Sequence, residues 1–157
     1  RDREALCQLS YGTTIDRWLI DNQGGPVKEQ RLDDRPQEFP RHDERLVGKP
    51  YRYGYTATFS ADGDFGGLLK HDLRGGRSET HSAGATRKFL EPVFVPRGTD
   101  AAEDDGWVMA YVYDAATNGG NVVILHAQDF AADPVATIHL PQRVPFGFHG
   151  NWVPDQA

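Results

Sequence analysis

The sequence predicts an all-β fold made of several short strands. Three observations support this prediction: helical periodicity is scarce, β-branched and aromatic residues gather in short runs, and the runs end at Gly, Asn or Asp. Asp-Gly and Asn-Gly pairs tolerate the positive φ of tight turns, so they indicate hairpin connections. At 157 residues the chain has the length of one average domain.

Five segments are expected to be strands. In order, they are residues 13–21, 51–60, 68–73, 107–114 and 122–127. The first ends at Asn-Gln-Gly-Gly, the second at Ala-Asp-Gly, the third at Arg-Gly-Gly, and the fourth at a run that contains Asn-Gly-Gly. Each boundary is rich in the residues that favour turns.

Two antiparallel hairpins follow from these segments. Residues 51–73 are expected to turn near Asp62-Gly63, and residues 107–129 near Asn118-Gly119-Gly120. The best helical candidate, residues 2–9, lacks a sustained apolar stripe. Residues 30–48 are polar and broken by proline, so we expect a long ordered loop there.

A weak internal repeat favours a β-propeller. Strands that end in Asp recur at Asp21, Asp72 and Asp129, and several strands in roughly 50 residues without a helix are typical of a propeller blade. A β-sandwich would fit the number of strands as well. No linker divides the chain, so we expect residues 1–157 to be a part of a single longer domain.

Composition excludes several classes of function. The net charge of −6 argues against a nucleic-acid-binding surface and gives no support to a polybasic membrane anchor. The longest apolar stretch, residues 107–113, is far shorter than the ~20 residues of a transmembrane helix. The single cysteine, Cys7, excludes an internal disulfide framework and favours a reducing compartment, so we expect a cytoplasmic location. Because the only methionine is Met109, we expect the chain to be a fragment that lacks an N-terminal part.

One histidine stands out as a candidate metal ligand. His149 lies between Gly147 and Gly150 in a segment that also holds two phenylalanines and a tryptophan. An imidazole in apolar surroundings needs a strong partner, which a metal or a carboxylate would supply. The histidines form no i, i+4 pair, so a metal site would be assembled from distant segments. A purely structural histidine is the alternative.

Two glutamates are candidates for that carboxylate. Glu38 precedes Phe-Pro, and Glu91 precedes Pro-Val-Phe-Val-Pro. Histidine ligands usually donate their second N–H to a carboxylate or a carbonyl group. Exposed glutamates at the start of a strand are the alternative interpretation.

The chain resembles the carotenoid cleavage oxygenase family, which includes carotenoid and apocarotenoid dioxygenases, lignostilbene dioxygenases and a retinoid isomerase. The likeness covers about residues 13–157 and matches the C-terminal portion of the family. It is carried by Glu-Phe-Pro-Arg at 38–41 with Gly-Lys-Pro-Tyr-Arg-Tyr at 48–53, Leu-Lys-His-Asp-Leu at 69–73, Glu-Pro-Val-Phe-Val-Pro-Arg at 91–97 with Glu-Asp-Asp-Gly-Trp at 103–107, and Pro-Phe-Gly-Phe-His-Gly-Asn-Trp at 145–152.

The resemblance implies the C-terminal blades of a seven-bladed β-propeller with a non-haem Fe(II) held by four histidines. His149 matches the last of these ligands, and Glu38 and Glu91 match two of the three glutamates that hold the histidines in place. The other ligands would lie before Arg1. Phe146, Phe148 and Trp152 are candidates for the wall of an apolar substrate site, with core packing as the alternative.

The implied activity is the oxidative cleavage by O₂ of a conjugated C=C bond in a carotenoid, apocarotenoid or stilbene, giving two carbonyl products. An isomerase is a further activity within the family, and the missing part could contact a membrane surface. Since the fragment has one of four ligands, we expect it to be inactive alone. A non-catalytic propeller module for binding or interaction is the alternative from another class.

Overall fold

The computed structural model describes residues 13–59, 63–145 and 147–155, so the helical candidate at 2–9 and Phe146 lie outside the described residues. The described strands are β1 (Ile15–Leu19), β2 (Lys28–Asp33), β3 (Gln37–Arg41), β4 (Tyr53–Phe59), β5 (Phe65–Asp72), β6 (Arg77–His81), β7 (Arg87–Phe89), β8 (Val93–Pro96), β9 (Gly106–Asp114), β10 (Gly119–His126) and β11 (Ala136–His139). A 3₁₀ turn, η1 (Glu44–Leu46), is the one helical element in this part of the chain. The predicted all-β class is confirmed.

The predicted hairpins are both present. Strand β4 pairs with β5, and β9 pairs with β10, in antiparallel register. Gly63 has φ +78° in the first turn and Asn118 has φ +49° in the second, where the backbone needs residues that tolerate this region. The second turn comes slightly earlier than expected, at residues 115–118, because Gly119 and Gly120 already pair in β10.

The predicted loop at 30–48 is wrong. This segment contains the end of β2, all of β3 and the turn η1. Strand β3 lies at a sheet edge and contains Pro40, so its composition gives no strand signal and its pairing with β4 decides its conformation. Sequence patterns also missed the short strands β6, β7, β8 and β11, which all lie at sheet edges.

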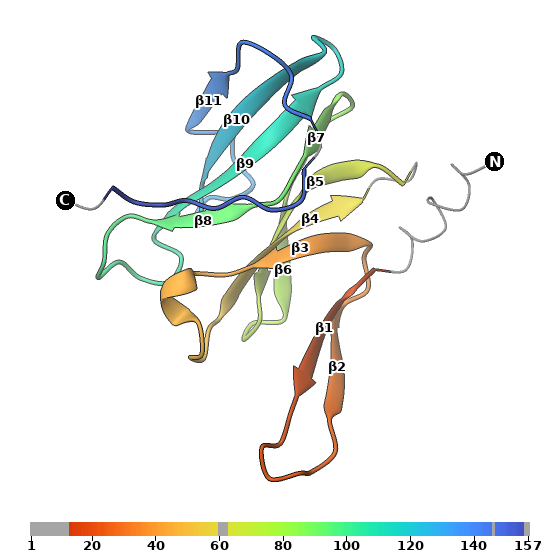
Figure 1. Ribbon diagram of the computed structural model, residues 1–157, viewed down its shortest axis with the longest axis vertical. Coiled ribbons are helices and arrows are strands. Elements are labelled where there is room, and N and C mark those ends of the chain that lie inside the picture. The colour runs from red at the N-terminus through yellow and green to blue at the C-terminus, as the bar shows by residue number, and fades with distance from the viewer. Residues whose placement is uncertain (1–12, 60–62, 146, 156–157) are drawn as a thin grey trace.

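The strands form three antiparallel sheets (Figure 1). One has the order β3-β4-β5-β6, and a second has the order β11-β10-β9, with both β7 and β8 along the far edge of β9. The core lies between these two sheets. The ring of Tyr55 on β4 stacks on Phe94 of β8 at 5.7 Å, and Leu68, Val108 and Phe130 are fully buried beside them. Burial of these side chains couples the two sheets.

Aspartates end strands by closing turns with their own carboxylates. Oδ1 of Asp72 accepts hydrogen bonds from the backbone N–H groups of Arg74 and Gly75, and Asp21 and Asp114 do the same for residues two positions further on. These are the local bonds that favour Asp at turns. The sequence predicted Asp129 as the third aspartate of the repeat. The third aspartate that closes a turn in this way is Asp114.

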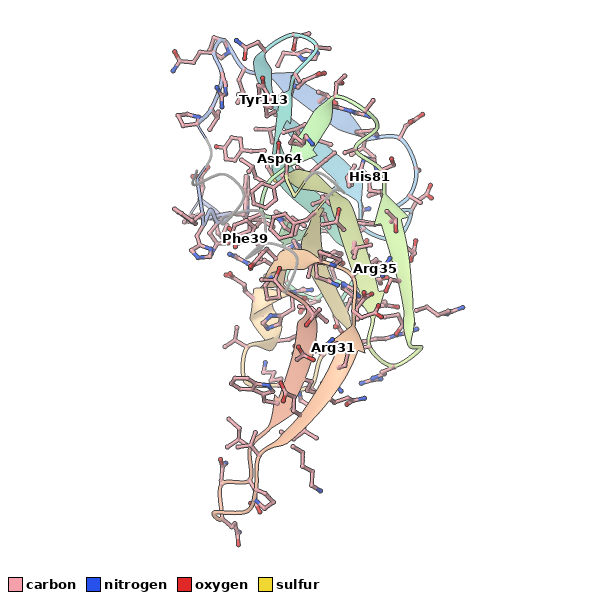
Figure 2. All side chains as sticks on the ribbon, turned by 90° about the vertical axis from the view of Figure 1, so that its right-hand side faces the viewer. Arg31, Arg35, Phe39, Asp64, His81 and Tyr113 are labelled. Carbon is pink, nitrogen blue, oxygen red and sulfur yellow. The ribbon has the colours of Figure 1, made fainter. Side chains whose placement is uncertain are left out.

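The third sheet is the hairpin β1–β2, which projects from the body of the molecule (Figures 1 and 2). It carries Arg31, whose guanidinium pairs with Asp16, and it leaves Trp18 and Leu19 largely exposed. A two-stranded hairpin of this kind is marginally stable alone. No helix in the described ranges has the length and apolar character needed to cross a bilayer.

A buried histidine lies within the β3–β6 sheet. Nε2 of His71 is 2.8 Å from Oε1 of Gln37 and 3.1 Å from Oγ1 of Thr56. Burial lowers the pKa of His71 below its ordinary value, while the carboxylate of Asp33 opposes this shift. The folded protein therefore favours the neutral ring.

This lowered pKa predicts a loss of stability in acid. A histidine whose folded pKa lies below the unfolded value of 6.5 contributes its full stability above that pH, and this contribution is lost as the pH falls through the folded pKa. We expect the thermal unfolding midpoint to fall between about pH 7 and about pH 5, and to fall less in His71→Gln. The remaining dependence in the variant would come from His81, whose pKa is also lowered by burial. An unchanged pH profile in His71→Gln would contradict this assignment.

Candidate functional site

The site begins at a bulge in β3. Phe39 and Pro40 lie opposite the single residue Thr56, so β3 contains one extra residue between Glu38 and Arg41. Phe39 has φ +57°, an uncommon conformation for a non-glycine residue, and Pro40 has no N–H to leave unpaired. Bulges re-aim side chains. Here the ring of Phe39 stacks on Phe65 at 5.7 Å.

A second bulge places Glu91. Strands β7 and β8 follow one another along the same edge of β9, and residues 90–92 between them lie opposite residues 110–111. The segment carries one residue more than its partner and contains Pro92, as the first bulge contains Pro40. Both candidate glutamates thus lie at proline-containing edges, where side chains leave the regular alternation of a strand.

His149 contacts Glu91, one of the two candidate carboxylates. Its Nδ1 is 3.1 Å from Oε1 of Glu91, within the expected range of hydrogen-bond distances, although 58 residues separate the two. An ionised carboxylate only accepts, so Nδ1 carries the hydrogen and donates it. The ring also lies edge-on against Phe39, with centroids 5.7 Å apart. A neutral ring in this tautomer presents a lone pair at Nε2.

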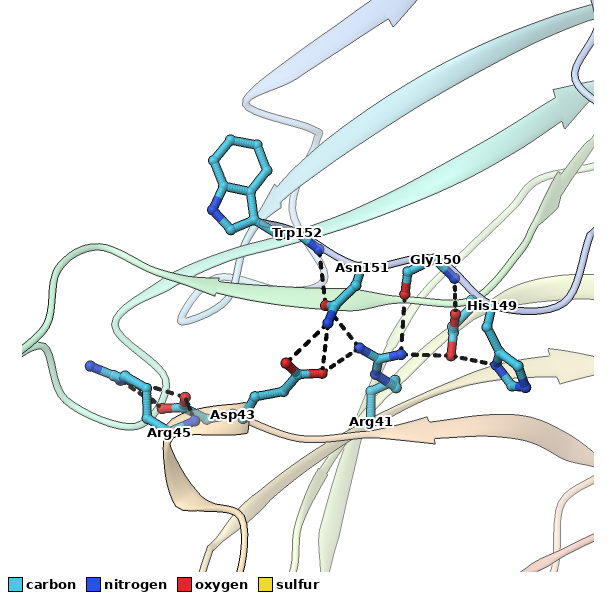
Figure 3. A network of polar contacts seen from close by, with 9 residues as sticks. Arg41, Asp43, Arg45, His149, Gly150, Asn151 and Trp152 are labelled. Atoms are coloured by element: carbon cyan, nitrogen blue, oxygen red, sulfur yellow. Dashed lines mark hydrogen bonds and ion pairs between the residues drawn. The ribbon is translucent and has the colours of Figure 1, made fainter. Parts of the chain in front are cut away.

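The carboxylate of Glu91 is almost fully paired (Figure 3). Its side chain is 5% exposed, Oε2 accepts the backbone N–H of Gly150 at 2.7 Å, and Oε1 also accepts Nη1 of Arg41 at 3.0 Å. Arg41 supplies the positive charge that a buried carboxylate requires. Glu91 therefore fixes both the ring of His149 and the backbone that follows it.

The glycines beside His149 have open space around them. A Cβ atom at Gly147 or Gly150 would meet open space within the described part of the chain. Gly150 contributes its peptide groups instead, since its N–H donates to Glu91 and its carbonyl accepts from Arg41 at 3.2 Å.

The aromatic neighbours of His149 do not enclose it. Phe148 and Trp152 are exposed, and they line a cavity of about 320 Å³. Strands of the second sheet contribute Val93, Met109, Tyr111 and Val122 to the same cavity. His149 and Glu91 also face this cavity. The position of Phe146 lies outside the described residues.

Glu38 is not joined to the His149 site. It is half-buried on β3, and its side chain makes no hydrogen bond or ion pair with another residue in the described ranges. Its predicted role toward a histidine ligand stays a prediction, with that histidine outside this chain.

The residues fit one ligand of a metal centre. The His149 side chain is 74% exposed, and within the described ranges Nε2 makes no hydrogen bond, so its lone pair is accessible to a metal. Donors of a full centre are not gathered here, because the described residues contain no group of three His, Cys, Asp or Glu side chains that could hold an ion.

Comparison with known proteins decides the family. The family model described as retinal pigment epithelial membrane protein matches residues 2–154. The chain belongs to this family. The match confirms the predicted membership among the carotenoid cleavage oxygenases, which also appear among its relatives.

Three relatives illustrate the family. The carotenoid cleavage oxygenase of Mycobacterium tuberculosis is 41% identical over 90% of this chain and 29% of its own length. The crystal structure of cobalt-substituted Synechocystis apocarotenoid oxygenase superposes with a TM-score of 0.86 at 34% identity, covering 92% of this chain and 31% of the other. The lignostilbene dioxygenase of Pseudomonas brassicacearum gives 0.82 at 35% identity, covering 89% and 32%.

These likenesses confirm the propeller fold of this oxygenase family, so the two larger sheets are blades. The chain spans about a third of the length of these proteins. Because the Synechocystis oxygenase was crystallised in a cobalt-substituted form, that relative is a metal-binding protein.

Sequence reasoning missed Arg41, Glu44 and Asn151. Arg41 and Glu44 hold Gly150 and Asn151, the residues after His149, through hydrogen bonds that join residues more than 100 positions apart. The available signal was adjacency: Arg41 ends the Glu-Phe-Pro-Arg motif, and Asn151 follows His149-Gly150. A sequence motif identifies residues that are adjacent in the chain, but it does not identify the residues that they contact in the folded protein.

The pairing of Glu91 predicts the effect of a neutral replacement. Glu91→Gln keeps the shape but offers one acceptor oxygen to three donors, so at least one donor is left unpaired. We expect a loss of about 1–3 kcal/mol in the free energy of unfolding, measured by denaturant titration. The control is Glu79→Gln at an exposed position on β6, which should change stability little. Equal stability of the two variants would contradict the pairing described here.

Proposed function

We propose that the protein containing this chain is a non-haem Fe(II) dioxygenase that cleaves a conjugated C=C bond of a carotenoid, apocarotenoid or stilbene into two carbonyl products. The observation that carries the proposal is His149, held through Nδ1 by a buried glutamate with Nε2 left accessible, in a chain of the carotenoid cleavage oxygenase family. The names of the relatives support the classes of substrate.

The donor set suits Fe(II). Neutral imidazoles bind this ion well, and an all-histidine set leaves its charge to be offset by outer carboxylates such as Glu91. When bound, the iron would supply O₂ activation next to the substrate. His149 would be one ligand, and the others would come from outside this chain, as would the histidine that Glu38 holds. The cobalt-substituted relative is consistent with a divalent metal in this family.

The reaction balances without another reagent. One C=C bond and one O₂ molecule give two C=O bonds, so no external proton or electron donor is consumed. The residues of this chain would then orient His149, exclude water and seat an apolar substrate. Phe148 and Trp152, which line the 320 Å³ cavity beside His149, are the candidates for that contact. Phe146 is kept as a third candidate from its place in the same motif.

We also propose that residues 1–157 are one part of a larger propeller domain. The hairpin β1–β2 leaves large apolar side chains exposed, and further strands would cover them. The chain also spans 29% of the Mycobacterium tuberculosis relative. Isolated, it would be inactive because it lacks the other ligands. A cytoplasmic location and contact with a membrane surface remain predictions.

Replacement of His149 tests the proposed ligand. In the full-length protein, we expect His149→Ala to lose iron and O₂-dependent cleavage together, measured by iron per protein and by product formation. His139→Ala is the matched control, because His139 is exposed on β11 and its Nδ1 contacts Asn121 instead of Glu91. Iron retained by His149→Ala at the wild-type stoichiometry would contradict the ligand role. A wild-type protein without iron or cleavage would favour the binding module.

Glu91→Gln tests the support of that ligand. A neutral amide still accepts a hydrogen bond but no longer offsets the charge of the metal, so we expect Fe(II) affinity to fall by about 10–100-fold. The measurement is competitive titration with a chelator, with Glu79→Gln as the control. Unchanged affinity would show that Glu91 acts on stability alone.

A further inference from the structure

Arg41 is the point where three segments meet. Its guanidinium extends from the end of β3 to Glu91 at the bulge before β8 and to residues 150–151 of the C-terminal segment (Figure 3). The side chain is mostly buried.

The two terminal nitrogens of the guanidinium contact different groups. Nη1 donates to Oε1 of Glu91 at 3.0 Å and to the carbonyl of Gly150 at 3.2 Å. Nη2 donates to Oε1 of Glu44 at 2.7 Å and to Oδ1 of Asn151 at 3.0 Å. A planar guanidinium fixes these directions relative to one another, which a lysine ammonium cannot do.

The contact with Glu91 matters more than that with Glu44. The Glu44 side chain is 54% exposed, and ion pairs at such sites contribute little. Glu91 is buried, so water does not replace the guanidinium beside it as a partner. Glu44 has a second function, because both of its oxygens accept the side-chain amide of Asn151 and close the network around the segment.

Arg41 therefore acts on both sides of His149. Its guanidinium donates to the carboxylate of Glu91, which accepts the N–H of Nδ1 of His149. It also donates to the carbonyl of Gly150 and to the side chain of Asn151. We infer that Arg41 is a positioning residue for His149, which sets the direction of Nε2 by fixing Glu91 and residues 150–151 together. This inference rests on the proposed function, in which Nε2 binds the metal.

The test is Co(II) binding by the metal-free full-length protein, followed by the visible absorption of bound Co(II). We expect Arg41→Met and Arg41→Gln to weaken Co(II) binding by about 10–100-fold and to alter the absorption bands. Both variants remove the positive charge and the paired N–H donors of the guanidinium. Arg41→Lys should recover part of the affinity, because its ammonium reaches Glu91 but cannot contact Asn151 in the same geometry.

Arg45→Met is the matched control. Arg45 pairs with the buried Asp43 on the same turn and donates to the carbonyls of Gly98 and Thr99, but it does not contact Glu91. We expect this variant to lose stability and keep its Co(II) affinity and spectrum. If Arg41 only stabilised the fold, replacing Arg41 and replacing Arg45 would have the same effect on Co(II) binding.

Two results would overturn the inference. One is wild-type Co(II) affinity and spectrum in the Arg41→Met or Arg41→Gln protein, whichever of the two folds. The other is equal weakening of binding in Arg45→Met. Both leave the proposed function intact as long as the wild-type protein binds Co(II), whereas a wild-type protein that binds none would refute the proposed function and this inference together.

Discussion

The site depends on one buried carboxylate. Glu91 is removed from water and must find donors and a positive charge within the protein. Three segments provide them: Arg41 from β3, the peptide of Gly150 and the ring of His149. Satisfying this single group decides how the C-terminal segment lies across the two larger sheets, and which nitrogen of the imidazole is left accessible.

Irregular sheet edges bring these groups together. A regular strand alternates its side chains between two faces, so neighbouring residues cannot serve one site. The bulges at Phe39-Pro40 and around Glu91 break that alternation, and proline suits both because an edge residue needs no N–H for the ladder. The positive φ of Phe39 is a strained conformation that the surrounding contacts maintain, and such strain concentrates at functional sites.

The apolar packing and the polar network occupy different parts of the molecule. The core between the two blades rests on apolar burial around Tyr55, Leu68 and Phe94. The polar network of Arg41, Glu44, Glu91 and Asn151 lies at its rim, beside the cavity that Phe148 and Trp152 line. A substitution in the polar network therefore changes the contacts of His149, while the apolar contacts between the two blades stay in place.

The sequence by itself determined the all-β class, the two hairpins and the family, because strand composition, turn residues and motif order are local properties. It also identified His149 and Glu91, through the resemblance of their motifs. Tertiary structure alone decided the edge strand β3 within residues 30–48, the bulges, and the partners Arg41, Glu44 and Asn151. The physical reason is that a polar edge strand and a long-range hydrogen bond are fixed by what packs against them, and that information is spread over residues far apart in the chain.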